Sequence, residues 1–143
     1  MPQLSNFVKI TKVEDHTAAG TADVDSASVD MAGYEGVLFL TSFGTAATNN
    51  YISAQQSSDD GSADAFADLT GTKIGATASD EDVWADIYRP RERYVRAHVE
   101  LGTSSTVESI WAIQYGGRKQ PVDNTTTGTI IGEAHVSVAE GTA

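Results

Sequence analysis

A short basic segment offers the clearest chemistry in this chain. Four of the nine Lys and Arg residues lie between positions 88 and 96, namely Arg89, Arg91, Arg93 and Arg96. Arginine presents a planar set of donors that binds a carboxylate in bidentate fashion, and it is enriched at protein interfaces. Because the whole chain carries a formal net charge of −11, this segment indicates a specific ion-pairing or docking site.

A second basic pair, Arg118 and Lys119, belongs to the same predicted protein interface. If the first segment is extended, Arg89, Arg91 and Arg93 share one face of a strand. Two kinds of acidic partner are open for them. One is another protein or an identical neighbouring subunit, and the other is an internal network. The internal candidates are Asp80, Glu81, Asp82 and Asp86.

The acidic segment 59–64 contains residue types that suit calcium. When Gly61 is aligned with the turn glycine of an EF-hand loop, the first ligand position falls on Gln56 and the bidentate position on Ala67, so the pattern fails. Asp and Gly favour tight turns. We therefore predict a turn between strands, with a calcium loop of another kind as the alternative.

No catalytic arrangement is recognisable. His16, His98 and His135 are scattered along the chain, and the common phosphate-binding, dinucleotide-binding and hydrolase motifs are missing. The absence of cysteine excludes thiolate chemistry, disulfides and cysteine-ligated metals. Glycosidase-like carboxylate pairs could form among the twenty acidic residues, but nothing ties one pair to a cleft. We predict no enzymatic activity, no cofactor and no metal.

Composition limits the partners. A pI near 4.4 argues against nucleic acid, because phosphate binding needs a basic face. The chain has no run of eighteen apolar residues, which a membrane-spanning helix would need. Its N-terminus lacks the basic and then apolar layout of a secretory signal. The expected partner is therefore another protein, met after synthesis in the cytoplasm.

Many short strands closed by turn residues are the dominant pattern. Besides a hairpin and a terminal strand, the expected strands are 7–13, 24–31, 34–43, 51–56 and 83–89. The segment 34–43 is apolar through its centre, which predicts a central strand with both faces covered. Pro90 marks an edge, a bulge or a strand start, because proline donates no ladder hydrogen bond.

The strongest hairpin prediction joins 93–101 to 107–115 through a five-residue loop, 102–106. A symmetric register places Val95 opposite Ile113, and it predicts that Trp111 is buried opposite Ala97. The same register sets Glu100 against Glu108, which like charges disfavour. A bulge or a shifted register is therefore open.

The composition changes after Pro121. Residues 123–128 resemble a linker, and alternating apolar residues in 130–138 predict one more half-buried strand. This strand either closes its own sheet or pairs with a neighbouring subunit. The sequence thus predicts an all-β fold: a single-domain β-sandwich or jelly-roll over 1–121, followed by a linker and a C-terminal strand or arm over 122–143.

Four segments carry a resemblance to a known family. They are 29–39, 55–62, 88–96 and 112–121, and the motifs Tyr-Arg-Pro-x-x-Arg-Tyr and Ile-Gln-Tyr-Gly are the most specific among them. In these segments the chain resembles small structural virion proteins of tailed bacteriophages, the capsid decoration (cement, or head-stabilising) proteins. The resemblance implies a protein on the outer capsid surface, made in the host cytoplasm, that binds the major capsid protein of the same phage.

A homo-oligomer is expected on this basis, with a trimer preferred over a dimer because capsid lattices offer local three-fold sites. Two other functions stay open. One is a head–tail or tail-tube component, which would form rings or tubes. The other is a carbohydrate-binding β-sandwich module, in which Trp84, Trp111 and tyrosines would form a stacking platform. A hydrolase using acidic residues ranks last.

Overall fold

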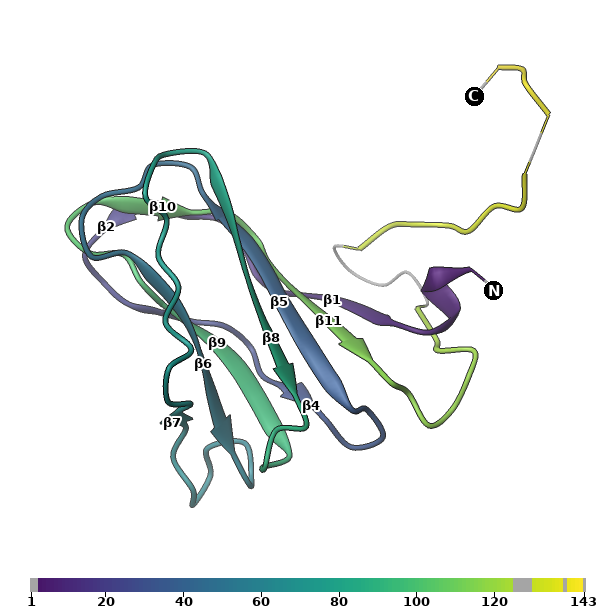
Figure 1. Cartoon of the computed structure of the whole chain (residues 1–143), viewed down its shortest axis with the longest axis horizontal. Helices are drawn as coiled ribbons and strands as arrows, with labels where there is room; N and C mark the ends of the chain where they lie inside the picture. The colour runs from purple at the N-terminus through teal and green to yellow at the C-terminus, as the bar shows by residue number, and fades with distance from the viewer. Residues whose placement is uncertain (1–2, 125–129, 138, 143) are drawn as a thin grey trace.

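Two antiparallel sheets packed face to face form the body of the protein, as the computed structural model shows (Figure 1). The structure describes residues 3–124, 130–137 and 139–142. Sheet A contains β1 (Lys9–Glu14), β11 (Ile110–Tyr115), β5 (Gly36–Phe43), β8 (Glu81–Tyr88), β10 (Ser105–Val107) and β2 (Thr17–Gly20). Sheet B contains β3 (Val24–Asp25), β4 (Val29–Asp30), β9 (Tyr94–Glu100), β6 (Tyr51–Ser57) and β7 (Ala67–Asp68).

The predicted all-β, single-domain sandwich is thereby confirmed. Its only helical turn in the described ranges is the 3-10 segment η1 (Leu4–Asn6). None of the residues described belongs to a helix long and apolar enough to cross a membrane.

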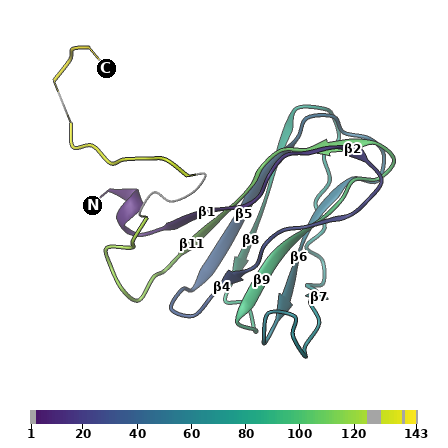
Figure 2. The same cartoon turned by 180° about the vertical axis from the view of Figure 1, so that it is seen from behind.

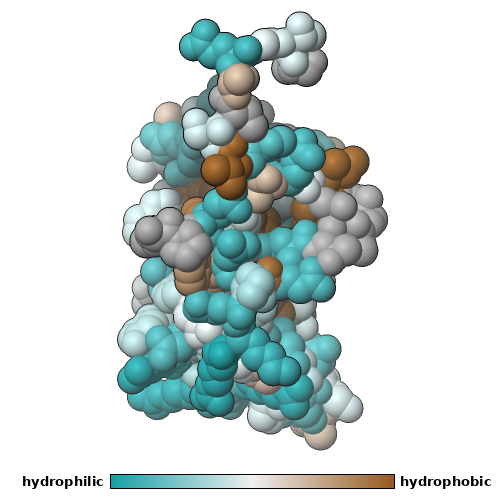
Figure 3. Space-filling model, turned by 90° about the vertical axis from the view of Figure 1, so that its right-hand side faces the viewer, coloured by the Kyte–Doolittle hydropathy of each residue, from teal (hydrophilic) through white to brown (hydrophobic). Residues whose placement is uncertain are grey.

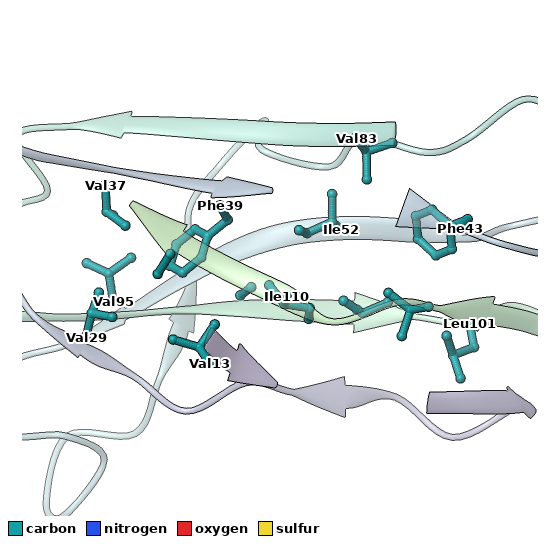
Figure 4. Packing of buried hydrophobic residues seen from close by; sticks show 14 of the residues in the cluster. Val13, Val29, Val37, Phe39, Phe43, Ile52, Val83, Val95, Leu101 and Ile110 are labelled. Atoms are coloured by element: carbon teal, nitrogen blue, oxygen red, sulfur yellow. The ribbon is translucent and has the colours of Figure 1, made fainter. Parts of the chain in front are cut away.

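The core lies between the inner faces of the two sheets (Figure 4). In β5 the side chains of Val37, Phe39 and Phe43 are fully buried, and alternate positions of β9 supply Val95 and Val99 from the opposite sheet. This period-2 burial is what a strand with one face on the core produces. The prediction that 34–43 is a central strand is confirmed, because β5 pairs with β11 on one side and with β8 on the other.

The predicted hairpin between 93–101 and 107–115 is wrong. β9 pairs with β6 in sheet B, where Ala97 lies opposite Ala54, while β11 pairs with β1 and β5 in sheet A. The chain crosses from sheet B to sheet A in the turn between β9 and β10. The inner faces of β9 and β11 therefore face each other across the core, and the two strands do not lie side by side in one sheet. The repulsion between Glu100 and Glu108 is also avoided, since Glu100 pairs with Lys73 at 2.7 Å.

The inward-facing positions of β11 are also the reverse of the predicted ones. Ile110, Ala112 and Gln114 are buried, whereas Trp111 is half-buried on the outer face of sheet A. The prediction that both faces of 34–43 are covered is likewise wrong for the described residues, because Leu40 on the outer face of β5 is 36% exposed.

The predicted C-terminal strand does not form in the described residues 130–137, which belong to no sheet. This segment leaves the body beside the start of β1 (Figures 1 and 2). Ile130 is half-buried as expected, but the side chains of 131–137 are exposed, with Ile131 at 93% and Val136 at 80%. Residue 138 and most of the expected linker, 125–128, lie outside the described residues.

Two residues just after Pro121 are attached to the body. Val122 is buried, and its N–H donates to the carbonyl of Asn6 at 2.8 Å. The amide of Asn124 donates to the carbonyls of Ser5 (2.8 Å) and Val8 (2.7 Å) and accepts from the N–H of Ile10 (2.9 Å). Asn124 thus holds the start of β1 in place through three hydrogen bonds.

Candidate protein-interaction site

The arginine segment forms the β8–β9 loop instead of an extended strip. β8 ends at Tyr88 and β9 begins at Tyr94, so the prediction that Arg89, Arg91 and Arg93 share one strand face is wrong. Arg89 has φ +51, in the left-handed region, and its N–H donates to the carbonyl of Glu35 at 2.7 Å. Because the following residue is a proline, which donates no ladder hydrogen bond, the strand cannot run on through this point.

Three loops meet at this end of the sandwich and enclose a shallow hollow of about 560 Å³. They are the β8–β9 loop, the β4–β5 loop and the segment that follows β11. We call this feature the arginine hollow. Its lining includes Tyr34, Glu35, Arg89, Arg91, Arg93 and Arg118. The structure therefore brings together four of the six predicted interface residues, from two regions of the sequence.

Arg93 is held by a bidentate ion pair. Its Nε donates to Asp30 Oδ1 at 2.9 Å and its Nη2 to Asp30 Oδ2 at 2.7 Å. The hydrogen bond from Arg93 holds the pKa of Asp30 below its ordinary value, and the same contact raises the pKa of Arg93. Asp30 also accepts the N–H of Ala32 at 2.9 Å, so this pair fixes the β4–β5 loop. Arg89 contacts Glu35 more loosely, at 3.7 Å.

The predicted internal partners of the arginines have other roles. Glu81 accepts the backbone N–H groups of Thr77 and Ala78, at 2.7 and 3.1 Å, which lowers the pKa of Glu81. Asp86 accepts the Tyr115 hydroxyl at 2.6 Å. Of the two alternatives that the sequence left open, the internal ion-pair network with residues 80–86 is therefore not the one that the described residues form. The acidic partners come instead from β4 and the β4–β5 loop.

Three of the basic side chains are available to an outside partner. Arg91, Arg118 and Lys119 are exposed, and none of them forms a side-chain ion pair with a described residue. Arg118 is positioned through its backbone, because its N–H donates to the carbonyl of Gly33 at 2.9 Å. Lys119 follows it in the chain but does not line the arginine hollow.

Arg96 lies apart from this site, on β9 in sheet B. Its Nη2 is 3.1 Å from Asp25, its Nε donates to Gln55 at 2.8 Å, and its guanidinium stacks over Phe66 at 4.3 Å. With its side chain only 22% exposed, Arg96 has a structural role in joining strands of sheet B.

The acidic loop at 59–64 is a turn, as predicted. The carboxylate of Asp59 accepts the N–H groups of Ser62 (3.0 Å), Ala63 (2.7 Å) and Asp64 (3.1 Å), which lowers the pKa of Asp59. Asp64 in turn accepts the N–H and the hydroxyl of Ser58. Throughout the part of the chain that the structure describes, no group of acidic and histidine side chains could hold a metal ion.

The three histidines remain separate in space, each beside its own acidic residue. His16 lies 3.0 Å from Glu108, His98 lies 2.7 Å from Asp25 and His135 lies 3.0 Å from Glu133. None of these pairs lines the arginine hollow.

Sequence reasoning missed Tyr34, Glu35 and Asp30 as parts of this site. Their only signal was position, because 30–35 falls inside a segment that carried the resemblance to decoration proteins. Comparisons of the chain with protein-family models and with curated protein sequences found no match.

Proposed function

We propose that this protein is a structural component of a tailed-phage virion that decorates the outer surface of the capsid and binds the major capsid protein. The observation that carries the proposal is the arginine hollow, which gathers four arginines at one place on a chain of formal net charge −11. The resemblance of the arginine segment and of residues 112–121 to decoration proteins supports the same function.

The roles of the basic residues differ. Arg91 and Arg118 bind carboxylates of the capsid protein, since both guanidinium groups are exposed and have no ion pair within the described chain. Arg93 and Asp30 hold the loops in place, so little ordering is needed on binding. Each contact is modest, and an oligomer that engages several capsid subunits at once gains affinity through avidity. The proposed function is binding alone and includes no catalytic step.

Co-sedimentation with mature and immature shells of the same phage tests this function. Saturable binding to the expanded shell, in a fixed ratio to the capsid protein, is expected. The double variant Arg91→Ala/Arg118→Ala should weaken this binding by at least about ten-fold, in the range of interface hot spots. Its melting temperature should stay unchanged, because neither side chain has a partner in the described chain.

A charge-matched control is Lys9→Ala/Lys73→Ala, which removes two positive charges away from the hollow. If both double variants bind as the wild type does, the hollow is not the docking site. If the wild type binds neither shell, the decoration role is wrong. A hexameric ring in solution would favour the tail component instead.

A further inference from the structure

The outer face of sheet A is more apolar than a two-layer sandwich requires. Antiparallel partners point to the same side of a sheet, so the register of the four long strands defines rows across this face. One row, running from β1 through β11 and β5 to β8, contains Lys12, Trp111, Leu40 and Trp84.

The neighbouring row on the same face contains Ile113, Leu38 and Asp86. Large apolar side chains of this face are open to solvent, since Trp84 is 59% and Tyr88 57% exposed. An antiparallel strand that faces water on one side normally alternates apolar and polar residues. A contiguous exposed apolar patch on a soluble body marks an interaction site.

The described part of the C-terminal segment covers only the border of this face. It lines a hollow of about 530 Å³ with Ile10 and Trp111, to which Ile130 and Ile131 contribute. Figure 3 shows hydrophobic surface below the projecting segment. Leu40, in the centre of the face, and Trp84, at its β8 side, do not belong to this hollow, and both are exposed.

We propose that a second copy of this chain covers the face, in a two-fold dimer whose axis runs parallel to the strands between β11 and β5. Such a rotation places the β1 border of one copy, together with the part of the C-terminal segment that lies beside it, against the β8 border of the other. Within the first row, Trp111 then lies against Leu40 of the second copy, and Lys12 lies over Trp84, near Asp86. The row is therefore complementary to itself, through apolar contact at its centre and cation–π attraction at its ends.

The other in-plane two-fold, perpendicular to the strands, would stack β1 on β1 and place Lys12 against Lys12. Like charges disfavour that arrangement. In the proposed dimer Lys12 keeps its own ion pair with Asp15, at 2.5 Å within the chain. The second row is completed on β1 by Ile10, so Asp86 comes to lie against Ile10 of the second copy. Lys12 of that copy, in the next row, offers the opposite charge, and the Tyr115 hydroxyl donates to Asp86 at 2.6 Å, so the carboxylate is not left without a partner, which would be the costly case. Aligned packing of two sheets is also a common arrangement for such faces.

This dimer is independent of the arginine hollow, which lies in the loops at one end of the sandwich. The two proposals can therefore fail separately. Capsid binding is measured by co-sedimentation with shells, whereas dimerisation is measured on the free protein. The geometry selects the dimer over the trimer that the capsid-lattice argument preferred.

Sedimentation velocity across a range of protein concentrations tests the dimer. The wild type should dimerise, and Leu40→Glu and Trp84→Thr should each raise the dissociation constant at least ten-fold. The control is Ile74→Ser, since Ile74 is 38% exposed, much like Leu40, but lies across the groove beside β8 and not on the face. Circular dichroism of each variant checks that the fold is kept.

Cross-linking provides a second readout that does not depend on weakening the contact. The chain has no cysteine, so Leu40→Cys introduces a single thiol close to the proposed axis. Facing sheets are about 10 Å apart, which is too far for a direct disulfide, so a short bis-maleimide linker is used; it should join two Leu40→Cys chains and leave Ile74→Cys chains monomeric.

Four results would overturn the proposal. They are a monomeric or trimeric wild type, a dimer that Leu40→Glu and Trp84→Thr leave intact, equal weakening by Ile74→Ser, and cross-linking of Ile74→Cys as efficient as that of Leu40→Cys. A monomer whose tryptophan fluorescence is quenched by oligosaccharides would likewise overturn it, and would assign the face to sugar binding.

Discussion

The attachment of residues 122–124 to the body yields a quantitative prediction. The sequence places the end of the domain at 121, yet Val122 is buried and Asn124 makes three hydrogen bonds to the entry of β1. We expect a chain that ends at 124 to be as stable as the full chain, and a chain that ends at 121 to be much less stable.

The magnitude follows from the contacts. Burying a valine side chain contributes about 1.5–3 kcal/mol. The three hydrogen bonds of Asn124 contribute roughly 1 kcal/mol each, less where solvent competes. With a reduction for surface already buried in the unfolded chain, the expected loss is about 4 kcal/mol. For a chain of this size that corresponds to a melting temperature lower by about 12 °C.

Urea denaturation followed by circular dichroism and tryptophan fluorescence measures this difference. The point variant Asn124→Ala should lose about 2–3 kcal/mol, because it removes all three hydrogen bonds and leaves Val122 in place. Gln120→Ala is the matched control, since that exposed amide makes one long bond of 3.3 Å, and it should change stability by less than about 0.5 kcal/mol. Equal stability of the chains ending at 121 and at 124 would refute the reasoning.

Three further predictions concern other parts of the fold. Gly102→Ala should cost at least about 3 kcal/mol in urea denaturation, because φ is +65 and the new Cβ would lie 2.1 Å from a backbone carbonyl oxygen; a change below about 0.5 kcal/mol would contradict the described loop. Burial and the hydrogen bond to Asp86 raise the pKa of Tyr115 above its ordinary 10.0, so its contribution to stability is complete below pH 10 and is lost as the pH rises beyond. Ultraviolet titration should show one tyrosine that ionises only on alkaline unfolding, and Tyr115→Phe should abolish that component. The hydrogen bond from Arg93 lowers the pKa of Asp30 below 3.8, so this pair stabilises the protein above that pH and ceases to do so as the pH falls through the lowered value; the stability difference between wild type and Arg93→Ala should therefore shrink in acid, and a constant difference would show that charge is not its cause.

The sequence was sufficient to predict the fold class and most of the long strands, because burial on one face imposes a period of two on the chain. β5 illustrates this, since its apolar centre correctly predicted a central position. β2 and β7 were not predicted. Their residues are mostly half-exposed or exposed and carry little hydrophobic signal.

Partner choice between strands could not be predicted from the pattern alone. β9 and β11 alternate as hairpin strands do, but alternation specifies only that a strand has an inner face, not which sheet it joins. The same limit explains the reversal at Trp111. Both sets of alternate positions in β11 are largely apolar, and the position of the strand between β1 and β5 decides which set is buried.

The sequence predicted most of the residues that form the candidate site, but it did not predict how they are arranged in space. Clustering in the sequence identified the arginines of the β8–β9 loop and the basic pair Arg118 and Lys119. The structure places Arg118, but not Lys119, in the arginine hollow, because β11 runs beside β5. The ion pair of Arg93 with Asp30 joins segments on different strands, far apart in the sequence. Charge counts along the chain cannot reveal such a partner.

The pairing of the first strand with the last has a consequence for synthesis. Within the described sheets, β1 hydrogen-bonds only with β11, through contacts such as Lys9 with Gln114. At about 5–20 residues per second, a ribosome takes roughly 5–20 s to make the hundred or so residues between them. During this time the apolar residues of β1 have no sheet to join. Sheet A is therefore completed only after β11 has been made, and a nascent chain that stops before β11 exposes an aggregation-prone edge.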